Sequence, residues 1–233
     1  MAGQSWRYPW PDHGDGPARL DRAEIVRASL ELLDADGVEQ FSTRKLAARL
    51  GIKSPSLYWH VKGKEELFAL VIDHVVGQCE LPSRRAGWRR QLDAIGHGLR
   101  QAIIEHPATP QLLLGRPLFG PNGLRLADHV IGALRGHGFT DKLASYGYIV
   151  FLNYVVGFAS QETAFGKGPG QRARLDQVEA FLAELPADEY PDLTAVRGEL
   201  VLGKFTHRFE LGLDAILDRL ENEHDATPPA RSS

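Results

Sequence analysis

Six basic side chains lie within residues 40–64, a stretch that contains no Asp or Glu. The chain as a whole carries a formal net charge of −3, so this positive charge is local. A local cluster of cations is suited to contact the phosphate groups of a nucleic acid, and a solvated basic face without a partner is the alternative. The six residues are Arg44, Lys45, Arg49, Lys53, Lys62 and Lys64.

The residues around this cluster predict two short helices behind a longer supporting helix. Ser42 or Thr43 can cap the first short helix, and Gly51 closes it. Ser54 followed by Pro55 fits the N-cap and the first position of the second short helix. Two short helices joined by "GIKS" in this way predict a helix-turn-helix motif.

The second short helix carries side chains suited to contact DNA. Ser54 and Ser56 are small enough to let the backbone approach the floor of the major groove, and Pro55 offers an apolar surface for a thymine methyl group. Tyr58 and His60 can donate hydrogen bonds to phosphates.

Leu57 and Trp59 alternate with these polar residues, and at least one of them must face the core of the three helices. We expect core packing for both.

The remainder of the chain shows helical periodicity without strand-like alternation, so we predict an all-α fold. A short apolar turn is expected at residues 111–114. The tail "DATPPARSS" lacks helical periodicity. The predicted helices span about residues 21–37, 42–50, 55–61, 64–79, 88–105, 122–134, 140–164, 174–185 and 193–221.

Four regions follow from this organisation. Residues 1–18 form a flexible N-terminal arm, in which we expect Trp6, Tyr8 and Trp10 to be incidentally exposed or packed on the body, with a specific contact as the alternative. Residues 19–66 form the helix-turn-helix domain, residues 67–223 form a second helical domain, and residues 224–233 form a disordered tail.

Composition places the chain among cytoplasmic proteins. Its content of 43% apolar and 24% charged residues is ordinary for a globular protein, and the single cysteine, Cys79, excludes an intrachain disulfide framework. No apolar run approaches the roughly 20 residues that span a bilayer, and no signal-peptide pattern precedes the first helix. We therefore expect no membrane partner.

The segment "FSTRKLAARLGIKSPSLYWHVKGKEELF" resembles the DNA-binding domain of the TetR family, in its tetracycline-repressor-like branch. The resemblance is strong over residues 21–68 and continues more thinly through Trp88, "GRP" at residues 115–117, "HGFT" and "GFASQE". It implies an N-terminal three-helix reading domain and a larger C-terminal helical domain that binds an effector and dimerises.

The resemblance also implies partners and contact residues. It predicts a repressor that binds a double-stranded DNA operator as a homodimer and is released when a small effector shifts the fourth helix. It requires no cofactor. The residues to which it assigns DNA contact are Thr43, Arg44, Ser54, Pro55, Ser56, Tyr58, His60 and Lys64.

The positions that would hold a tetracycline–magnesium complex in that branch differ here. They carry Glu80, Ile95, Leu99 and Gln161, with Glu162 one residue from the place of the branch's glutamate. No metal-binding pattern remains, so we expect an aromatic, neutral or weakly polar effector other than tetracycline–magnesium.

Candidates for contact with this effector lie on the helices between residues 64 and 164, and each has core or dimer packing as its alternative. Asn153 stands apart, because a buried amide needs a ligand, a partner subunit or the backbone as its hydrogen-bond partner. The candidates are His74, Trp88, Ile95, Leu99, Leu113, Phe119, Phe151, Asn153, Tyr154, Phe158 and Gln161.

An enzymatic function is not supported, because the sequence has no zinc-protease motif, Cys/His cluster, phosphate loop or nucleophile elbow. His207 and Glu210 share a helix face, which is far more often a surface pair than a metal site. The remaining alternative is a DNA-binding regulator whose second domain serves only for dimerisation or protein contacts.

Overall fold

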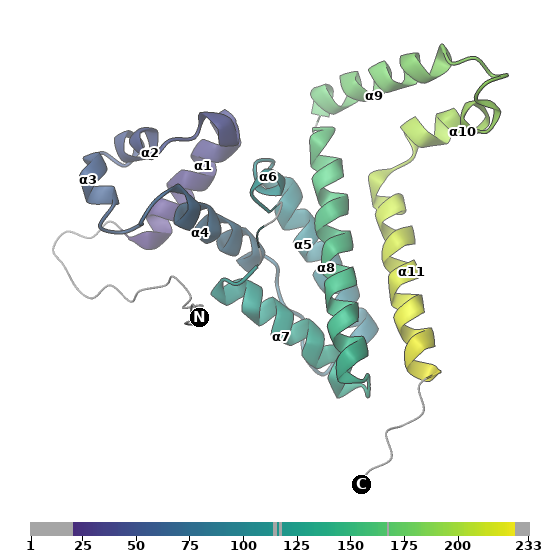
Figure 1. The fold of residues 1–233 in the computed structure, drawn as a ribbon, viewed down its shortest axis with the longest axis horizontal. Coiled ribbons are helices and arrows are strands. Elements are labelled where there is room, and N and C mark those ends of the chain that lie inside the picture. The colour runs from purple at the N-terminus through teal and green to yellow at the C-terminus, as the bar shows by residue number, and fades with distance from the viewer. Residues whose placement is uncertain (1–20, 114–115, 117, 167, 227–233) are drawn as a thin grey trace, which may run out of the picture. The chain divides into compact units, whose positions relative to one another are not determined.

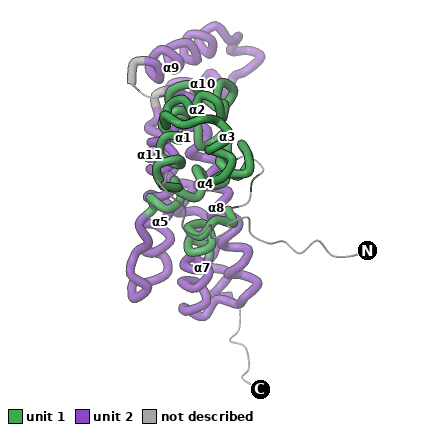
Figure 2. Tube along the Cα trace, turned by 90° about the vertical axis from the view of Figure 1, so that its left-hand side faces the viewer, with its two compact units in different colours: residues 1–79, 108–127 green, residues 80–107, 128–233 purple. Residues whose placement is uncertain are grey.

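The computed structural model describes residues 21–113, 116, 118–166 and 168–226, which form eleven helices and no strand (Figure 1). The predicted all-α fold is confirmed. The chain divides into two compact units, residues 1–79 with 108–127 and residues 80–107 with 128–233 (Figure 2). The predicted arm, with Trp6, Tyr8 and Trp10, lies outside the described residues, as do residues 227–233.

The first unit begins with α1 (Arg22–Gln40) and α2 (Thr43–Arg49). The Asp21 carboxylate caps α1 by accepting a hydrogen bond from the Ala23 N–H at 3.1 Å. Gly37 has φ of 79°, a left-handed conformation that interrupts the regular helix where the sequence predicted its end. Ser42 caps α2 by accepting from the Lys45 N–H at 3.2 Å.

The helices α3 (Ser54–Leu57) and α4 (Lys64–Gly77) follow. Lys53, not Ser54, is the N-cap of α3, so the helix starts one residue before the predicted position and has a single turn. Leu57 is fully buried, as predicted, and Val61 is 1% exposed. We call residues 21–63 the reading head.

Residues 108–127 complete the first unit with α6 (Thr109–Leu113) and the start of α7 (Pro121–Gly136). Asn122, the first residue of the helix predicted over residues 122–134, has a side chain that suits an N-cap, yet it does not cap α7. Asn122 lies in the first turn, and its side-chain amide donates to Asp73 on α4. The backbone N–H groups of Asn122 and Gly123 also donate to the Asp73 carboxylate, which takes the role of the cap.

The second unit is built on α5 (Trp88–Glu105), α8 (Asp141–Ala164) and α11 (Phe205–Asp225), which pack along one another (Figure 1). Thr140 caps α8 by accepting from the Leu143 N–H at 3.2 Å. The core of this bundle consists of apolar residues that recur at helical spacing and are at most 1% exposed: Leu92, Ile95, Leu99, Ile103, Phe151, Val155, Phe209, Leu213 and Leu217.

Two further helices, α9 (Gly168–Ala183) and α10 (Pro191–Leu202), pair with each other beyond the ends of α8 and α11 (Figure 1). The single last helix predicted over residues 193–221 is wrong, because the chain is extended at Gly203 and α10 and α11 are separate. The predicted tail also starts too early, since α11 continues to Asp225. The pair exposes Phe181 by 64% and Val196 by 50%.

By length and composition alone, α8 could cross a membrane, although the core helix of a soluble protein passes the same test. This finding differs from the expectation that no apolar run is long enough. Only 28% of its most apolar 18-residue window is buried. Much of the apolar surface of α8 is thus not covered by the parts of this chain that the structure describes.

Candidate DNA-binding surface and effector site

The fold of the reading head turns the predicted DNA-contact residues outward. Leu57 and Val61 are buried one helical turn apart, so the side chains beside them point to solvent. Pro55 and Ser56 are exposed, Ser54 and His60 are half-buried, and Tyr58 is 53% exposed. Ser54, Pro55, Tyr58 and Trp59 line a shallow surface hollow.

The two short helices are joined on this surface by a hydroxyl contact. The Thr43 and Tyr58 hydroxyl oxygens lie 3.2 Å apart, so the start of α2 and the end of α3 present one polar edge. Arg44 is exposed beside Thr43. The structure therefore brings Thr43, Arg44 and Tyr58 to the same surface, as a DNA-contact role requires.

Five of the six basic residues divide into two groups. The Lys45 ammonium pairs with Asp36 at 2.8 Å, and the Arg49 guanidinium pairs with Glu31 at 2.5 Å. Among the described residues, Arg44, Lys53 and Lys62 have no ion-pair partner. Unpaired exposed cations keep their full charge available for phosphate.

Lys64 points differently from the other predicted contacts. Its ammonium donates to the carbonyl oxygens of Val38 and Phe41 at 3.4 and 3.3 Å, and it lies 5.1 Å from the centre of the Phe68 ring. The side chain thus joins the start of α4 to the end of α1. A phosphate contact by Lys64 stays a prediction.

Trp59 is the clearest correction in this region. It is 81% exposed, so the prediction that it packs in the core is wrong. The reason is that α3 ends at Leu57 and a turn follows, so that Leu57 and Val61 fill the inward positions. The alternation of apolar and polar residues left this open, because it only required that one of Leu57 and Trp59 be buried.

Four of the eight effector candidates in the second unit are packed in its core. Ile95, Leu99 and Phe151 are fully buried, and Trp88 is 9% exposed, with its ring edge on Phe139 at 5.0 Å between centroids. This burial favours the packing alternative for these four residues.

Tyr154 and Phe158 are half-buried on α8 and surround Phe209 of α11. Tyr154 stacks on the Phe209 ring with centroids 5.6 Å apart, and its hydroxyl donates to the Phe209 carbonyl oxygen at 2.8 Å. Phe158 meets the same ring edge-on at 5.4 Å. Burial raises the pKa of the Tyr154 phenol, so this group remains a donor at neutral pH.

A buried ion pair in this cluster was missed by the sequence reasoning. Arg100 on α5 binds Glu162 on α8 through two hydrogen bonds of 2.8 and 2.7 Å, and the side chains are 10% and 13% exposed. The Arg100 guanidinium also lies 5.0 Å from the centre of the Phe209 ring. Helical spacing could have indicated that Arg100 is buried, because it lies on the inward face of α5 with Gly96 and Ile103.

Asn153 and Gln161 are exposed on α8. Asn153 shares its face with Tyr146, Ile149 and Val150, which are 61%, 50% and 52% exposed. The three partner options applied to a buried amide; because Asn153 is exposed, solvent can satisfy it.

The other three effector candidates belong to the first unit. His74 is exposed and Leu113 is 7% exposed. Phe119 is 54% exposed and lines a cavity of about 30 Å³. Within the described residues, no group of three or more His, Cys, Asp or Glu side chains is arranged to hold a metal ion.

Family models match both parts of the chain. Residues 25–71 match "Bacterial regulatory proteins, tetR family", and residues 81–223 match "Tetracyclin repressor-like, C-terminal domain". The second match alone covers more than half of the chain, and the first contains α2, α3 and the unpaired Arg44.

Relatives agree with these models. An HTH-type transcriptional regulator of Saccharopolyspora erythraea is 41% identical to this chain. The match covers 63% of this chain and 62% of that relative. The HTH-type transcriptional repressor DrrR1 of Streptomyces coeruleorubidus is 33% identical over 91% of this chain and 80% of its own. ActR of Streptomyces coelicolor in complex with actinorhodin is 32% identical, with a TM-score of 0.79 over 89% of this chain and 99% of ActR. The chain belongs to the TetR family of transcriptional regulators, with a tetracycline-repressor-like C-terminal domain, and the family is not enzymatic.

Proposed function

We propose that this protein is a cytoplasmic repressor that binds an inverted-repeat operator as a homodimer and is released by a small, largely apolar or aromatic effector other than tetracycline–magnesium. The observation that carries the proposal is the outer surface of the reading head. Arg44, Pro55, Ser56 and Tyr58 are exposed together, within a stretch that has no carboxylate. Arg44 and Tyr58 then supply donors for bases and phosphates.

Because Trp59 is exposed and does not pack in the core, its side chain enlarges this surface. An indole that is 81% exposed beside Pro55 and Tyr58 has its N–H and ring face available to the DNA backbone. Trp59 is therefore added to the eight predicted contacts.

The homodimer is supported by the uncovered face of α8. Tyr146, Ile149, Val150, Asn153 and Gly157 recur at spacings of three and four residues and are exposed, and Leu211 on α11 is 70% exposed. An exposed stripe of mainly apolar residues of this kind is typical of a protein interface. A two-fold axis would place the two reading heads on the two halves of an inverted repeat.

The effector class is supported by the aromatic residues on α8 and by the relative ActR, which was solved with actinorhodin. The competing function is a regulator whose second domain only packs and dimerises. The full burial of Ile95, Leu99 and Phe151 favours that alternative.

Selection of bound DNA from a random pool tests whether the operator is an inverted repeat. The selected site should be an inverted repeat with half-site centres about one helical turn apart, roughly 34 Å. An asymmetric site saturated by one monomer would contradict the dimer.

A thermal-shift screen separates the two functions of the second domain. Actinorhodin and other aromatic lipophilic compounds should raise Tm if a pocket exists, because a ligand that binds only the folded state stabilises it by mass action. A compound that raises Tm should also lower operator affinity. A library without any stabilising compound would favour the regulator without an effector.

A further inference from the structure

The start of α7 is held by a single carboxylate of another helix. Asp73, which is 8% exposed in α4, accepts from the backbone N–H groups of Asn122 and Gly123 at 2.9 and 3.0 Å through Oδ1. Its Oδ2 accepts from Asn122 Nδ2 at 3.0 Å, and the same Nδ2 donates to the Asp73 carbonyl oxygen at 3.1 Å. We call these four bonds the Asp73 clasp.

Close approach of the two segments depends on a residue without a side chain. A Cβ atom at Gly120 would lie 1.9 Å from Asp73 Oδ1, so no other residue fits this position without displacing the carboxylate. The clasp also stabilises the buried carboxylate, because N–H groups without an intrahelical partner at a helix N-terminus are strong donors to it.

A second tie joins the same segment to the first turn of α4. The Arg116 guanidinium binds Glu65 Oε2 at 2.7 Å, and it lies 5.6 Å from the centre of the Phe68 ring. Glu65 is 77% exposed, so this tie is weak compared with the buried clasp. The two ties are eight residues apart on α4, or about 12 Å along the helix.

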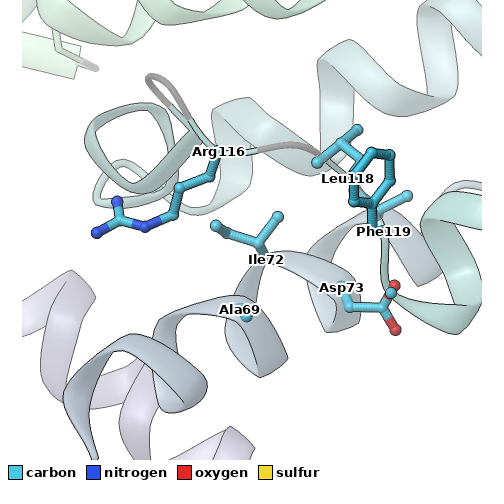
Figure 3. A pocket seen from close by; sticks show the side chains of 8 residues that line it. Ala69, Ile72, Asp73, Arg116, Leu118 and Phe119 are labelled. Atoms are coloured by element: carbon cyan, nitrogen blue, oxygen red, sulfur yellow. The ribbon is translucent and has the colours of Figure 1, made fainter. Parts of the chain in front are cut away.

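Between the two ties lies the cavity of about 30 Å³, lined on α4 by Ala69, Ile72 and Val76. Ile72 points from α4 toward the segment that carries Leu118 and Phe119 (Figure 3). Phe119 is 54% exposed, so the apolar contact of this segment with α4 is incomplete. The hydrogen bonds of the clasp therefore fix where the start of α7 lies along α4.

The first turn of α4 is also bound to the reading head. Glu66 pairs with Arg22 at 3.1 Å and accepts from the Lys62 N–H at 2.6 Å, next to the exit of α3. One helix thus carries contacts to the reading head at its start and the clasp further along. A displacement of the start of α7 must either break the clasp or move α4.

We infer that Asp73 is a positioning residue that couples the start of α7 to the reading head, so that the two regions change together when DNA is bound or released. The inference rests on the proposed release of DNA by an effector. Coupling is reciprocal, so operator DNA must in turn affect the clasp. That reciprocity allows a test without knowledge of the effector.

Amide hydrogen exchange on the full chain, with the selected operator DNA as the probe, tests the inference. In the wild type, saturating operator should slow exchange at the Asn122 and Gly123 amides about fivefold or more. In Asp73→Asn this slowing should be lost, while α3 and the first turn of α4 remain protected by DNA. Equal slowing in the variant and the wild type, or no response in the wild type, would overturn the inference.

Two further variants keep the test decisive. Asn122→Ala removes the side-chain bonds of the clasp, retains both backbone N–H groups, and should show a reduced slowing; if Asp73→Asn does not fold, this variant decides the outcome. Glu65→Gln breaks only the exposed tie and should respond like the wild type. The two proposals can fail separately. If no ligand releases the protein from operator DNA, the proposed effector control is wrong, whereas the exchange rates at Asn122 and Gly123 still decide whether Asp73 couples α7 to the reading head.

Discussion

The reading head and the second unit differ in what covers their apolar residues. In the reading head, Tyr58 and Trp59 are the exposed large apolar residues, and both lie on the predicted DNA surface. The second unit exposes many more, on α8, on α11 and on the pair α9–α10. The exposed apolar residues of the reading head thus lie on the surface proposed for DNA, whereas those of the second unit include the face proposed for a second subunit.

A charge on the outer face of α8 tests this difference most strongly. Val150→Glu should give a monomer, because it places a carboxylate in the proposed interface. Loss of the second half-site contact should lower operator affinity about 100-fold to 10,000-fold, measured by gel shift beside sedimentation. Ala94→Glu adds the same charge at an exposed position of α5 and should leave both measurements unchanged. A dimeric Val150→Glu would remove α8 from the interface.

The buried ion pair gives the next effect, on stability. Arg100→Met leaves the Glu162 carboxylate without its cation and should lower the free energy of unfolding by about 3–5 kcal/mol, measured by urea denaturation. The double variant Arg100→Met/Glu162→Leu should recover most of this loss, because no charge is then buried alone. If the single variant is as stable as the wild type, Arg100 and Glu162 do not form a buried ion pair in solution.

Arg44 tests the DNA surface itself. Arg44→Ala should lower operator affinity by about 1–3 kcal/mol and reduce the slope of affinity against salt by about one. Arg49→Ala is the matched control, because its guanidinium is already paired with Glu31. Equal losses for both variants would show that the charge, and not its position, matters.

The contrast between Leu57 and Trp59 tests which of the two residues stabilises the core of the reading head. Leu57→Ala should destabilise the protein by about 2–5 kcal/mol, because it opens a cavity in the core. Trp59→Ala should change stability by less than about 0.5 kcal/mol and still weaken operator binding. A large loss of stability in Trp59→Ala would restore the core role that the sequence predicted.

His129 provides the smallest effect, a pH dependence confined to the second unit. Burial lowers the pKa of His129, and the nearby Arg84 guanidinium lowers it further. A histidine with a depressed folded pKa stabilises the fold above its unfolded pKa of about 6.5, and this contribution is lost as pH falls below that value. The wild-type Tm should therefore fall more steeply than that of His129→Gln between pH 7.5 and pH 5.5; parallel curves would contradict it.

The sequence predicted the reading head better than the second unit for a physical reason. Caps and helix ends depend on local residues, so Ser42, Gly37 and the bounds of α5 could be predicted from their neighbours in the chain. Asn122 has a good local capping residue type, yet Asp73, which is 49 residues away, takes that role. Contacts between distant segments are not encoded in periodicity.

The same lack of information on distant contacts explains why some residues of the candidate site were not predicted. Arg100 and Glu162 are 62 residues apart, and neither stands in a motif that announces a partner. Trp59 could not be assigned by alternation, because the length of α3 decides which apolar residue turns inward. The break at Gly203 was missed because helical periodicity resumes directly after it. The predicted DNA contacts, in contrast, rest on one continuous segment of the sequence, and they stay predictions.

The short recognition helix has a consequence for how this regulator can diversify. Of the four residues in α3, only Leu57 is buried, while Pro55 and Ser56 are exposed. In the proposed docking to DNA, substitutions at the exposed positions change the contacts in the groove without changing the buried residue that packs α3 on the rest of the reading head. New operator preferences are therefore a few single-residue steps away, which makes this segment a natural place to engineer regulators that ignore one another's promoters.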